Sequence, residues 1–307
     1  MKIVLLDALT FGETDLSGFD SLGEVKVYQT TSPEEVQTRI TNCDVIVTNK
    51  VVVTDTHMAE TPTLKLICVA ATGMNNVDLN AAKERGIEVK NVAGYSTDSV
   101  IQHTFSMLFY LMGHSRYYDE VVKDGTYSRS PIFTDVSQPF FEIKGKKWGV
   151  IGLGEIGRGV AKIADAFGAQ VCYYSTSGKN HSQAYTRLRL DELLKSCDII
   201  TIHAPLNEQT ENLLDYEQLL TCKDGATILN LGRGGIINEE AVAKIIDGRN
   251  IFFGLDVLTK EPMRENHPLL SVKNADNLYI TPHIAWTSVE ARDKLIASVV
   301  ENIKSIS

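Results

Sequence analysis

Residues 146–175 read KKWGVIGLGEIGRGVAKIADAFGAQVCYYS, which joins the patterns of a strand, a glycine turn, a helix and a second strand. Gly152, Gly154 and Gly157 lie in the turn in the order G-x-G-x-x-G. The first glycine permits a tight turn, the second lets a pyrophosphate approach the backbone, and the third lets the helix pack against the strand. The stretch therefore predicts a dinucleotide site, with the phosphates facing the N–H groups at the helix start.

The acidic residue that usually ends the second strand of such a unit is missing. An Asp or Glu there binds the ribose hydroxyls of NAD, whereas this chain has Ser175, Thr176 and Ser177, followed by Lys179. Hydroxyls and a lysine can surround a 2′-phosphate without the repulsion of a carboxylate. We expect these residues to contact the cofactor, which can be NAD or NADP; the alternative is a polar surface loop.

Length and composition indicate a two-domain protein, because 307 residues with 43% hydrophobic content can build two cores. A net charge of -9 and a pI near 5.3 argue against a nucleic-acid or anionic-membrane partner. The first residues are typical of a strand rather than a signal peptide, and no apolar stretch has the length of a membrane span, so a cytoplasmic location is expected. Five scattered cysteines predict reduced, mostly buried thiols, with no disulfide and no metal site.

Short apolar runs alternate with helical patterns through most of the chain, which is typical of parallel sheets. In the first part, strands are predicted at residues 3–6, 25–28, 44–48, 66–69 and 87–89. In the second part, they are predicted at residues 148–151, 171–174, 199–202, 226–231, 252–257 and 278–281. The predicted fold class is α/β, with two Rossmann-like or flavodoxin-like parallel-sheet domains and a cleft between them.

The end of the chain is predicted to return to the first domain. An amphipathic pattern over residues 288–306 indicates a helix whose apolar face needs a sheet to cover. We therefore expect residues 1–95 and 285–307 to form a discontinuous substrate-binding (catalytic) domain. Residues 96–284 are expected to form the dinucleotide-binding Rossmann domain.

A helix predicted over residues 97–117 carries more apolar residues than one buried face requires. Part of its surface is therefore expected to be a subunit interface. His103 and His114 lie on this helix and are interpreted as structural.

Two loops of the first domain follow strand carboxyl ends, where open α/β sheets bind ligands. One contains Asn49 and Lys50, and the other contains Ala71, Thr72 and Gly73. The small residues of the second loop could direct backbone N–H groups at a carboxylate. We expect all five residues to contact the substrate; ordinary βα turns are the alternative.

The later strands of the second sheet also end in polar loops, which should gather along one edge beside the glycine turn. Arg233, between glycines, offers a planar bidentate donor for a carboxylate. His283 can transfer a proton near neutral pH, and Glu261 could pair with it and orient its ring. These residues fit hydride transfer between a nicotinamide and a 2-hydroxy acid, which needs a proton donor and a fixed cation.

Five motifs follow one another along the second part of the chain. They are Gly152-Leu153-Gly154-Glu155-Ile156-Gly157, His203-Ala204-Pro205-Leu206, Asn230-Leu231-Gly232-Arg233-Gly234-Gly235, Gly254-Leu255-Asp256-Val257 with Glu261-Pro262, and Thr281-Pro282-His283-Ile284-Ala285. Together they resemble the D-isomer-specific 2-hydroxyacid dehydrogenases, and the resemblance covers nearly the whole chain. It implies that Arg233 binds the substrate carboxylate and polarises the carbonyl, that His283 is the acid/base, and that Glu261 supports His283.

The resemblance also implies the ligand contacts of both domains. The backbone of residues 71–73 would bind the substrate carboxylate, and Asp256 would hold the nicotinamide carboxamide. With the glycine turn, it predicts these cofactor-binding residues: Thr104, Gly152, Gly154, Glu155, Ile156, Gly157, Ser175, Thr176, Ser177, Lys179, His203, Ala204, Pro205, Leu231, Gly232 and Asp256.

Within the family, the runs GYSTDSV at 94–100, QHTF at 102–105 and HIAW at 283–286 are most similar to the glycerate dehydrogenase and hydroxypyruvate reductase branch. Trp286 would then lie near C3 of the substrate. The prediction is an NAD(P)-dependent oxidoreductase that interconverts hydroxypyruvate or glyoxylate with D-glycerate or glycolate, and forms a homodimer. The alternatives are a D-lactate or 3-phosphoglycerate dehydrogenase, or a non-catalytic dinucleotide sensor like the corepressor relatives, which would not need a proton donor.

Overall fold

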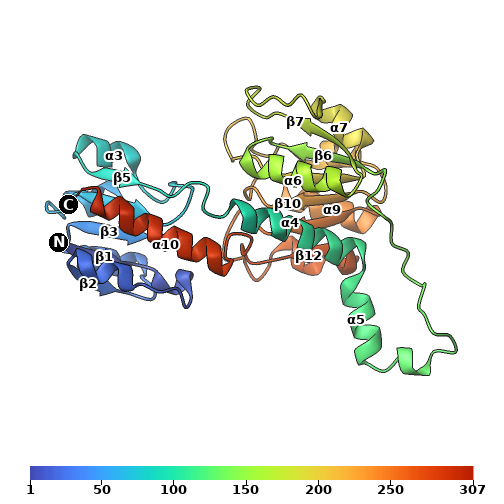
Figure 1. Cartoon of the computed structure of the whole chain (residues 1–307), viewed down its shortest axis with the longest axis horizontal. Helices are drawn as coiled ribbons and strands as arrows, with labels where there is room; N and C mark the ends of the chain where they lie inside the picture. The colour runs from blue at the N-terminus through green and yellow to red at the C-terminus, as the bar shows by residue number, and fades with distance from the viewer. Residues whose placement is uncertain (307) are drawn as a thin grey trace. The chain divides into compact units, whose positions relative to one another are not determined.

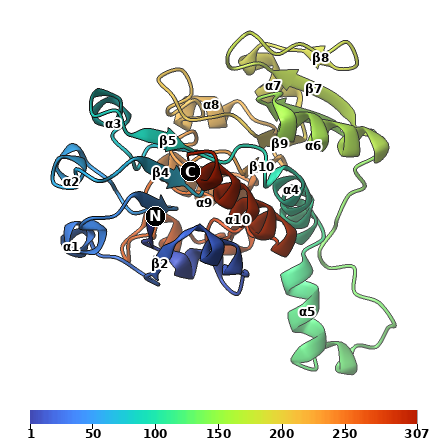
Figure 2. The ribbon, with the colours of Figure 1, turned by 60° about the vertical axis from the view of Figure 1, so that its left-hand side comes forward.

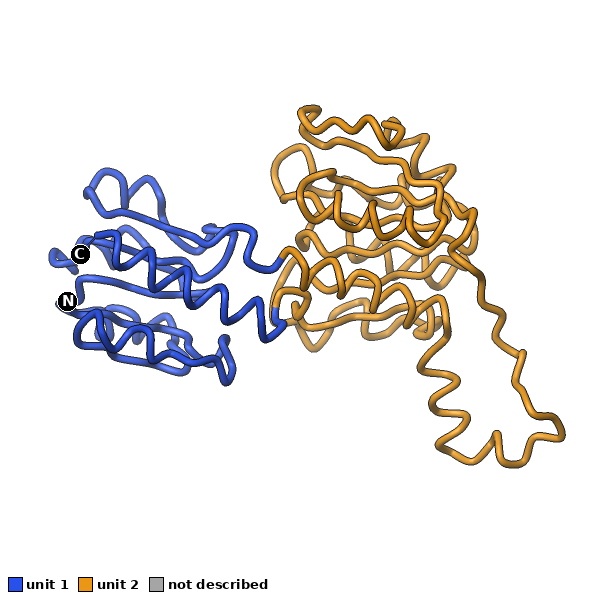
Figure 3. Tube along the Cα trace, viewed as in Figure 1, with its two compact units in different colours: residues 1–96, 287–307 blue, residues 97–286 orange. Residues whose placement is uncertain are grey.

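The computed structural model describes residues 1–306, which divide into two compact units (Figure 1, Figure 3). One unit contains residues 1–96 and 287–306, and the other contains Thr97–Trp286. Each is a parallel sheet with helices packed on it, so the predicted α/β fold class with two parallel-sheet domains is confirmed.

The first unit has a five-stranded sheet in the order β2-β1-β3-β4-β5. Its central strands are mostly apolar and buried, because a parallel strand is covered on both faces. The strands are β1 (Lys2–Leu5), β2 (Glu24–Val27), β3 (Val45–Thr48), β4 (Leu66–Val69) and β5 (Glu88–Lys90). The helices are α1 (Val36–Ile40), α2 (Asp55–Ala59), α3 (Leu79–Glu84) and α10 (Val289–Lys304), with short 3₁₀ helices at Ala8–Phe11, Ser17–Leu22 and Pro33–Glu35.

Helix α10 brings the end of the chain back to this sheet (Figure 1). The Ser288 hydroxyl caps its start by accepting a hydrogen bond from the N–H of Ala291. Its buried face contacts β4 and the Ser17–Leu22 turn. That face consists of Ala291, Leu295, Ile296, Val299, Val300 and Ile303.

A buried carboxylate fixes the loop that follows β3. Asp7 accepts hydrogen bonds from the N–H groups of Asn49 at 2.9 Å, Lys50 at 2.7 Å and Val51 at 3.2 Å. The Thr48 hydroxyl donates to the same carboxylate at 3.3 Å. These backbone donors would otherwise lack partners at the strand end, so Asp7 sets the shape of the loop.

The second unit has a seven-stranded parallel sheet in the order β12-β11-β10-β9-β6-β7-β8. Its strands are β6 (Lys147–Ile151), β7 (Gln170–Tyr174), β8 (Thr186–Arg187), β9 (Ile199–Ile202), β10 (Thr227–Asn230), β11 (Phe252–Leu255) and β12 (Leu278–Ile280). Its helices are α4 (Thr97–Met112), α5 (Ser115–Lys123), α6 (Glu155–Ala166), α7 (Leu190–Ser196), α8 (Tyr216–Leu220) and α9 (Glu239–Gly248), with 3₁₀ turns at Tyr127–Arg129, Pro268–Ser271 and Ala275–Asn277.

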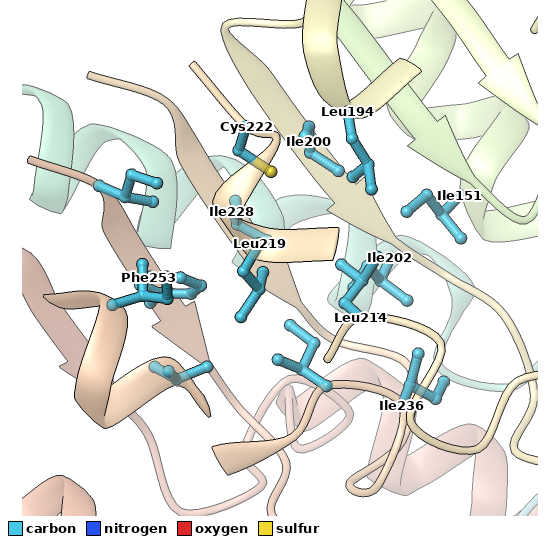
Figure 4. Packing of buried hydrophobic residues seen from close by; sticks show 14 of the residues in the cluster. Ile151, Leu194, Ile200, Ile202, Leu214, Leu219, Cys222, Ile228, Ile236 and Phe253 are labelled. Carbon is cyan, nitrogen blue, oxygen red and sulfur yellow. The ribbon is translucent and has the colours of Figure 1, made fainter. Parts of the chain in front are cut away.

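The two faces of this sheet bury separate apolar cores. On one face, Ile200, Ile228 and Phe253 pack with side chains of α7, α8 and α9 (Figure 4). On the other face, α4 and α6 cover Trp148 and Ile199. Neighbouring residues of β9 therefore face opposite cores, as the alternation of a strand requires.

The helix predicted over residues 97–117 is wrong in its extent, because the structure has two helices. Helix α4 ends at Met112, and α5 begins at Ser115. Between them His114 has φ +47°, a left-handed conformation that stops an α-helix. Helix α5 and the segment after it extend away from the sheet of this unit (Figure 1, Figure 2).

All five cysteines are free and buried, as predicted. The short polar strand β8 was not among the predicted strands, because two residues carry no periodic signal. No helix among residues 1–306 combines the length and the apolar character needed to cross a bilayer.

Replacing Asp7 with Ala should lower the free energy of unfolding by about 3 kcal/mol, because four donors lose their shared acceptor. Urea unfolding followed by circular dichroism measures the change. Asp20→Ala is the matched control, because the Asp20 side chain is exposed and forms no hydrogen bond or ion pair with any of residues 1–306. Equal stability of the two variants would contradict this account of the loop.

Candidate functional site

The glycine turn lies between β6 and α6, and its three glycines meet different surroundings. A Cβ on Gly157 would lie 2.1 Å from the carbonyl oxygen of Gly152. A Cβ on Gly152, which has φ +91°, would lie 2.9 Å from the backbone of His203 and Ala204. A Cβ on Gly154 would meet nothing within 4 Å. The protein itself therefore excludes side chains at two of the positions, whereas the space at Gly154 suits a ligand that approaches the start of α6.

A buried hydroxyl without a partner lies at the end of β7. Ser175 is 4% exposed, and its Oγ bonds to no atom of residues 1–306. Thr176 is half-buried, while Ser177 and Lys179 are exposed on the loop that follows. A buried polar atom without a partner is costly, so Ser175 Oγ fits a ribose hydroxyl.

The loop after β9 lies against the glycine turn. The backbone of Ala204 approaches both Gly152 and Gly232 so closely that a Cβ on either would lie within 2.9 Å of it. Both ring nitrogens of His203 are shielded from solvent and have no partner among residues 1–306. Burial lowers the pKa of His203 to about 3, so the ring is neutral at physiological pH. With Ser175, these unsatisfied polar atoms fit a bound dinucleotide.

Asn230, the last residue of β10, shapes the loop that carries Arg233. Its amide group donates to the Arg233 carbonyl at 2.9 Å and accepts from the Gly232 N–H at 3.1 Å. The Arg233 side chain is half-buried and forms no ion pair with any of residues 1–306. An uncompensated guanidinium at a strand end is suited to bind an anion.

The next loop carries Glu261 and packs directly against the Arg233 loop. A Cβ on Gly234 would lie 2.0 Å from the Leu258 carbonyl, so only glycine permits this contact. Glu261 Oε1 accepts the N–H of Leu258 at 2.9 Å. Glu261 Oε2 lies 2.7 Å from His283 Nδ1. The structure thus brings Glu261 and His283 together from the ends of β11 and β12.

The ring of His283 has a defined tautomer in this pair. A carboxylate can only accept, so Nδ1 carries the proton and Nε2 remains for proton exchange. His283 has φ +56°, and its N–H donates to the carbonyls of Asp256 and Thr281 at 2.8 and 2.9 Å. Left-handed backbone at a non-glycine residue costs about 1–3 kcal/mol and is typical of functional sites.

Asp256 holds the turn that positions His283. Its carboxylate is 1% exposed and accepts from the Thr281 hydroxyl at 2.6 Å and from the N–H groups of Ile284 and Ala285 at 2.8 and 3.0 Å. His103 Nε2, on α4, lies 3.1 Å from the Thr281 hydroxyl. Burial lowers the pKa of His103, and the nearby Asp256 carboxylate opposes this shift. No local pattern predicts that His103 joins this cluster.

A second carboxylate–imidazole pair, Glu239 with His267, holds the loop that carries Glu261. Glu239 accepts hydrogen bonds from the Thr259 N–H at 2.6 Å and from its hydroxyl at 2.8 Å. Its other oxygen lies 2.8 Å from His267 Nε2. The sequence signal at Glu239 is only that of a helix start after the N-cap Asn238, so this anchor was not predicted.

Four other predicted residues differ in burial and in local contacts. The Thr104 hydroxyl is buried within α4 and donates to the Val100 carbonyl at 2.8 Å. Leu231 is buried in the core, Pro205 is exposed, and Trp286 is half-buried at the end of the second unit.

The predicted substrate loops belong to the first unit, at the carboxyl ends of β3 and β4. The N–H groups of Asn49 and Lys50 are already bonded to Asp7. The N–H groups of Ala71, Thr72 and Gly73 donate to no atom of the described chain.

Comparison with known proteins identifies the family. The family model "D-isomer specific 2-hydroxyacid dehydrogenase, NAD binding domain" matches residues 105–285. A hydroxypyruvate reductase from Blautia hydrogenotrophica is 38% identical over 99% of this chain and 96% of its own length. A glycerate dehydrogenase from Methylorubrum extorquens is 33% identical over 99% of this chain and 95% of its own. The solved structure of an acyclic imino acid reductase with NADPH and D-Arg is 30% identical, covers 100% of this chain and 97% of its own, and has a TM-score of 0.86.

The chain belongs to the D-isomer specific 2-hydroxyacid dehydrogenase family. The predicted family, oxidoreductase class and nicotinamide dinucleotide cofactor are thereby confirmed. Its relatives include proteins named for the branch that the sequence predicted.

Two alanine substitutions in the glycine turn should affect different properties, one the stability of the fold and the other the affinity for the cofactor. Gly157→Ala should lower the free energy of unfolding by about 2 kcal/mol, because its Cβ collides with backbone. Gly154→Ala, at φ −77°, should leave unfolding unchanged but weaken binding of the reduced dinucleotide about tenfold or more. Thermal unfolding and titration of nicotinamide fluorescence measure the two effects. Wild-type affinity in Gly154→Ala would count against a pyrophosphate at this position.

Proposed function

We propose that this protein reduces a small 2-keto acid, hydroxypyruvate or glyoxylate, to the D-2-hydroxy acid with a reduced nicotinamide dinucleotide. The observation that carries the proposal is the 2.7 Å contact between His283 Nδ1 and Glu261 Oε2. It provides an oriented acid/base at the carboxyl edge of a dinucleotide-binding sheet. The names of the relatives support the substrate class.

When bound, the reduced nicotinamide supplies the hydride. In the reduction, the imidazolium form of His283 gives its Nε2 proton to the carbonyl oxygen of the substrate, while Glu261 holds the ring through the proton that stays on Nδ1. Arg233 binds the substrate carboxylate and polarises the carbonyl, because its guanidinium is not neutralised by an acidic residue of the described chain. In the reverse direction, His283 accepts the proton of the hydroxyl group.

We propose the second unit as the dinucleotide-binding domain, and its loops would make the contacts to the cofactor. The glycine turn would hold the pyrophosphate, and Ser175 the adenosine ribose. His203 is neutral and has unsatisfied ring nitrogens, which suits hydrogen bonding to the cofactor. Asp256 would orient the nicotinamide carboxamide, although the turn 281–285 already occupies much of its carboxylate.

The first unit would bind the substrate. The N–H groups of Ala71, Thr72 and Gly73 are available for its carboxylate. The Lys50 side chain is exposed, and it is the only basic residue in the loops 48–50 and 70–74. A 3-phosphoglycerate substrate would require more cations than these loops supply. Trp286 would contact the C3 side of a small substrate.

Arg233→Ala and His283→Ala should each lower kcat about 100-fold or more with hydroxypyruvate, because each removes a group that acts in the transition state. Glu261→Gln should lower it less, because the ring keeps one hydrogen-bond partner. Loss of reduced-nicotinamide absorbance measures the rates, with Arg85→Ala, a surface pair with Asp55, as the control. Wild-type turnover in His283→Ala, with an unchanged circular dichroism spectrum, would contradict the assignment of His283 as the acid/base.

The proposal includes a homodimer. Seven large apolar side chains are exposed on α5 and the segment after it, with Phe133 89% exposed. An apolar pocket of about 450 Å³ lies between α4 and the end of that segment, lined by Phe109, Met112 and Phe141 among others. We call residues 115–141, which carry the seven exposed side chains, the arm. A second copy would present the same arm and the same pocket, so the two surfaces are self-complementary. The seven residues are Val122, Tyr127, Ile132, Phe133, Val136, Phe140 and Phe141.

Light scattering after gel filtration should give twice the mass of the chain for wild type, and Phe133→Glu should shift it toward the monomer. Leu270→Glu is the control, because Leu270 is 61% exposed outside the arm. A monomeric wild type would refute the dimer.

The five free thiols suit a reducing compartment, so we extend the proposal to a cytoplasmic location.

A further inference from the structure

We propose that this enzyme prefers NADPH to NADH, and that Arg158, Lys179 and Arg187 select it by binding the phosphate on the adenosine ribose. This inference rests on the dehydrogenase function proposed above. It concerns the loop of residues 175–181, which follows β7 at the place where an acidic residue would bind the ribose of NAD.

The charge of this region differs from that of the whole chain. Residues 166–190 contain no Asp or Glu, although the chain has a net charge of -9. The same stretch contains Lys179, Arg187 and Arg189. A local excess of positive charge on an acidic protein concentrates an anionic ligand at that place.

Two arginines reach the loop from different elements. Arg158 follows the glycine turn in the first turn of α6, and its Nη2 donates to the His181 carbonyl at 2.8 Å. Arg187 lies on β8, which pairs with β7 so that Arg187 is opposite Tyr173. A terminal nitrogen of Arg187 lies 3.9 Å from the position that a Cβ on Gly178 would take. Both guanidinium groups therefore lie beside the segment that would hold the ribose; Figure 2 shows β7 and β8 side by side.

These cations are not neutralised by the described chain. Arg158, Lys179 and Arg187 form no ion pair with any of residues 1–306, whereas Arg189 pairs with Asp191 at 3.2 Å. Glu155, also in the first turn of α6, is the nearest acidic residue in sequence to Arg158 and forms no ion pair there. A 2′-phosphate carries close to two negative charges and accepts several charge-assisted hydrogen bonds.

Ser175 contributes the remaining part of the argument. Its buried Oγ has no partner within the described residues, and it replaces the carboxylate that would repel a 2′-phosphate. The hydroxyl can donate to a phosphate oxygen, and the cations can surround the other oxygens. The combination favours the phosphorylated ribose over the plain one.

Binding without turnover tests the inference. Dissociation constants of NADPH and NADH are measured by calorimetry, together with those of adenosine 2′,5′-bisphosphate and AMP. NADPH should bind at least tenfold more tightly than NADH, and the bisphosphate more tightly than AMP. Arg158→Ala and Arg187→Ala should each weaken NADPH binding fivefold or more and change NADH binding less than twofold.

Arg189→Ala is the matched control, because this neighbouring arginine of the same stretch is paired with Asp191. Equal affinities of wild type for NADPH and NADH would overturn the inference, and so would variants that weaken both cofactors alike. A marked NADPH preference without turnover of any 2-keto acid would refute the proposed reaction and leave this inference standing.

Discussion

Contact between backbones at the carboxyl edge of the second sheet is the constraint on which the site depends. Gly152, Gly232 and Gly234 each lie where a side chain would collide with the backbone of a neighbouring loop. These contacts join the ends of β6, β9, β10 and β11 into one continuous edge. The glycine turn, Arg233 and the Glu261–His283 pair can therefore belong to different strands and still lie along one edge of the sheet.

Carboxylate side chains that bond to the loops have two roles. Asp7, Asp256 and Glu239 accept backbone N–H groups, and so fix the loops after β3, β12 and β11. Glu261 also accepts one backbone N–H, but its second oxygen orients the imidazole of His283. Loops built in this way are held by charged hydrogen bonds rather than by an apolar core. These hydrogen bonds hold the side chains at the carboxyl ends of the strands in fixed positions.

Local sequence patterns were sufficient to predict most of the sheet strands, the glycine turn and the fold class, because apolar runs and glycine spacing report on neighbouring residues. The proximity of Glu261 and His283 could also be predicted, since parallel strands place their ends together. Three other contacts could not be predicted, because each joins residues more than fifteen positions apart. They are the bonds of Glu239 to Thr259, the contact of His103 with Thr281, and the bonds of Asp7 to the loop after β3. The helix break at His114 was missed because a left-handed residue gives no periodic signal.

The configuration of the product tests the central claim most directly. Purified protein would be incubated with hydroxypyruvate and a reduced nicotinamide dinucleotide, and the glycerate formed would be resolved by chiral chromatography. The account predicts D-glycerate, formed in step with oxidation of the dinucleotide. Formation of L-glycerate, or oxidation of the dinucleotide without any glycerate, would contradict it.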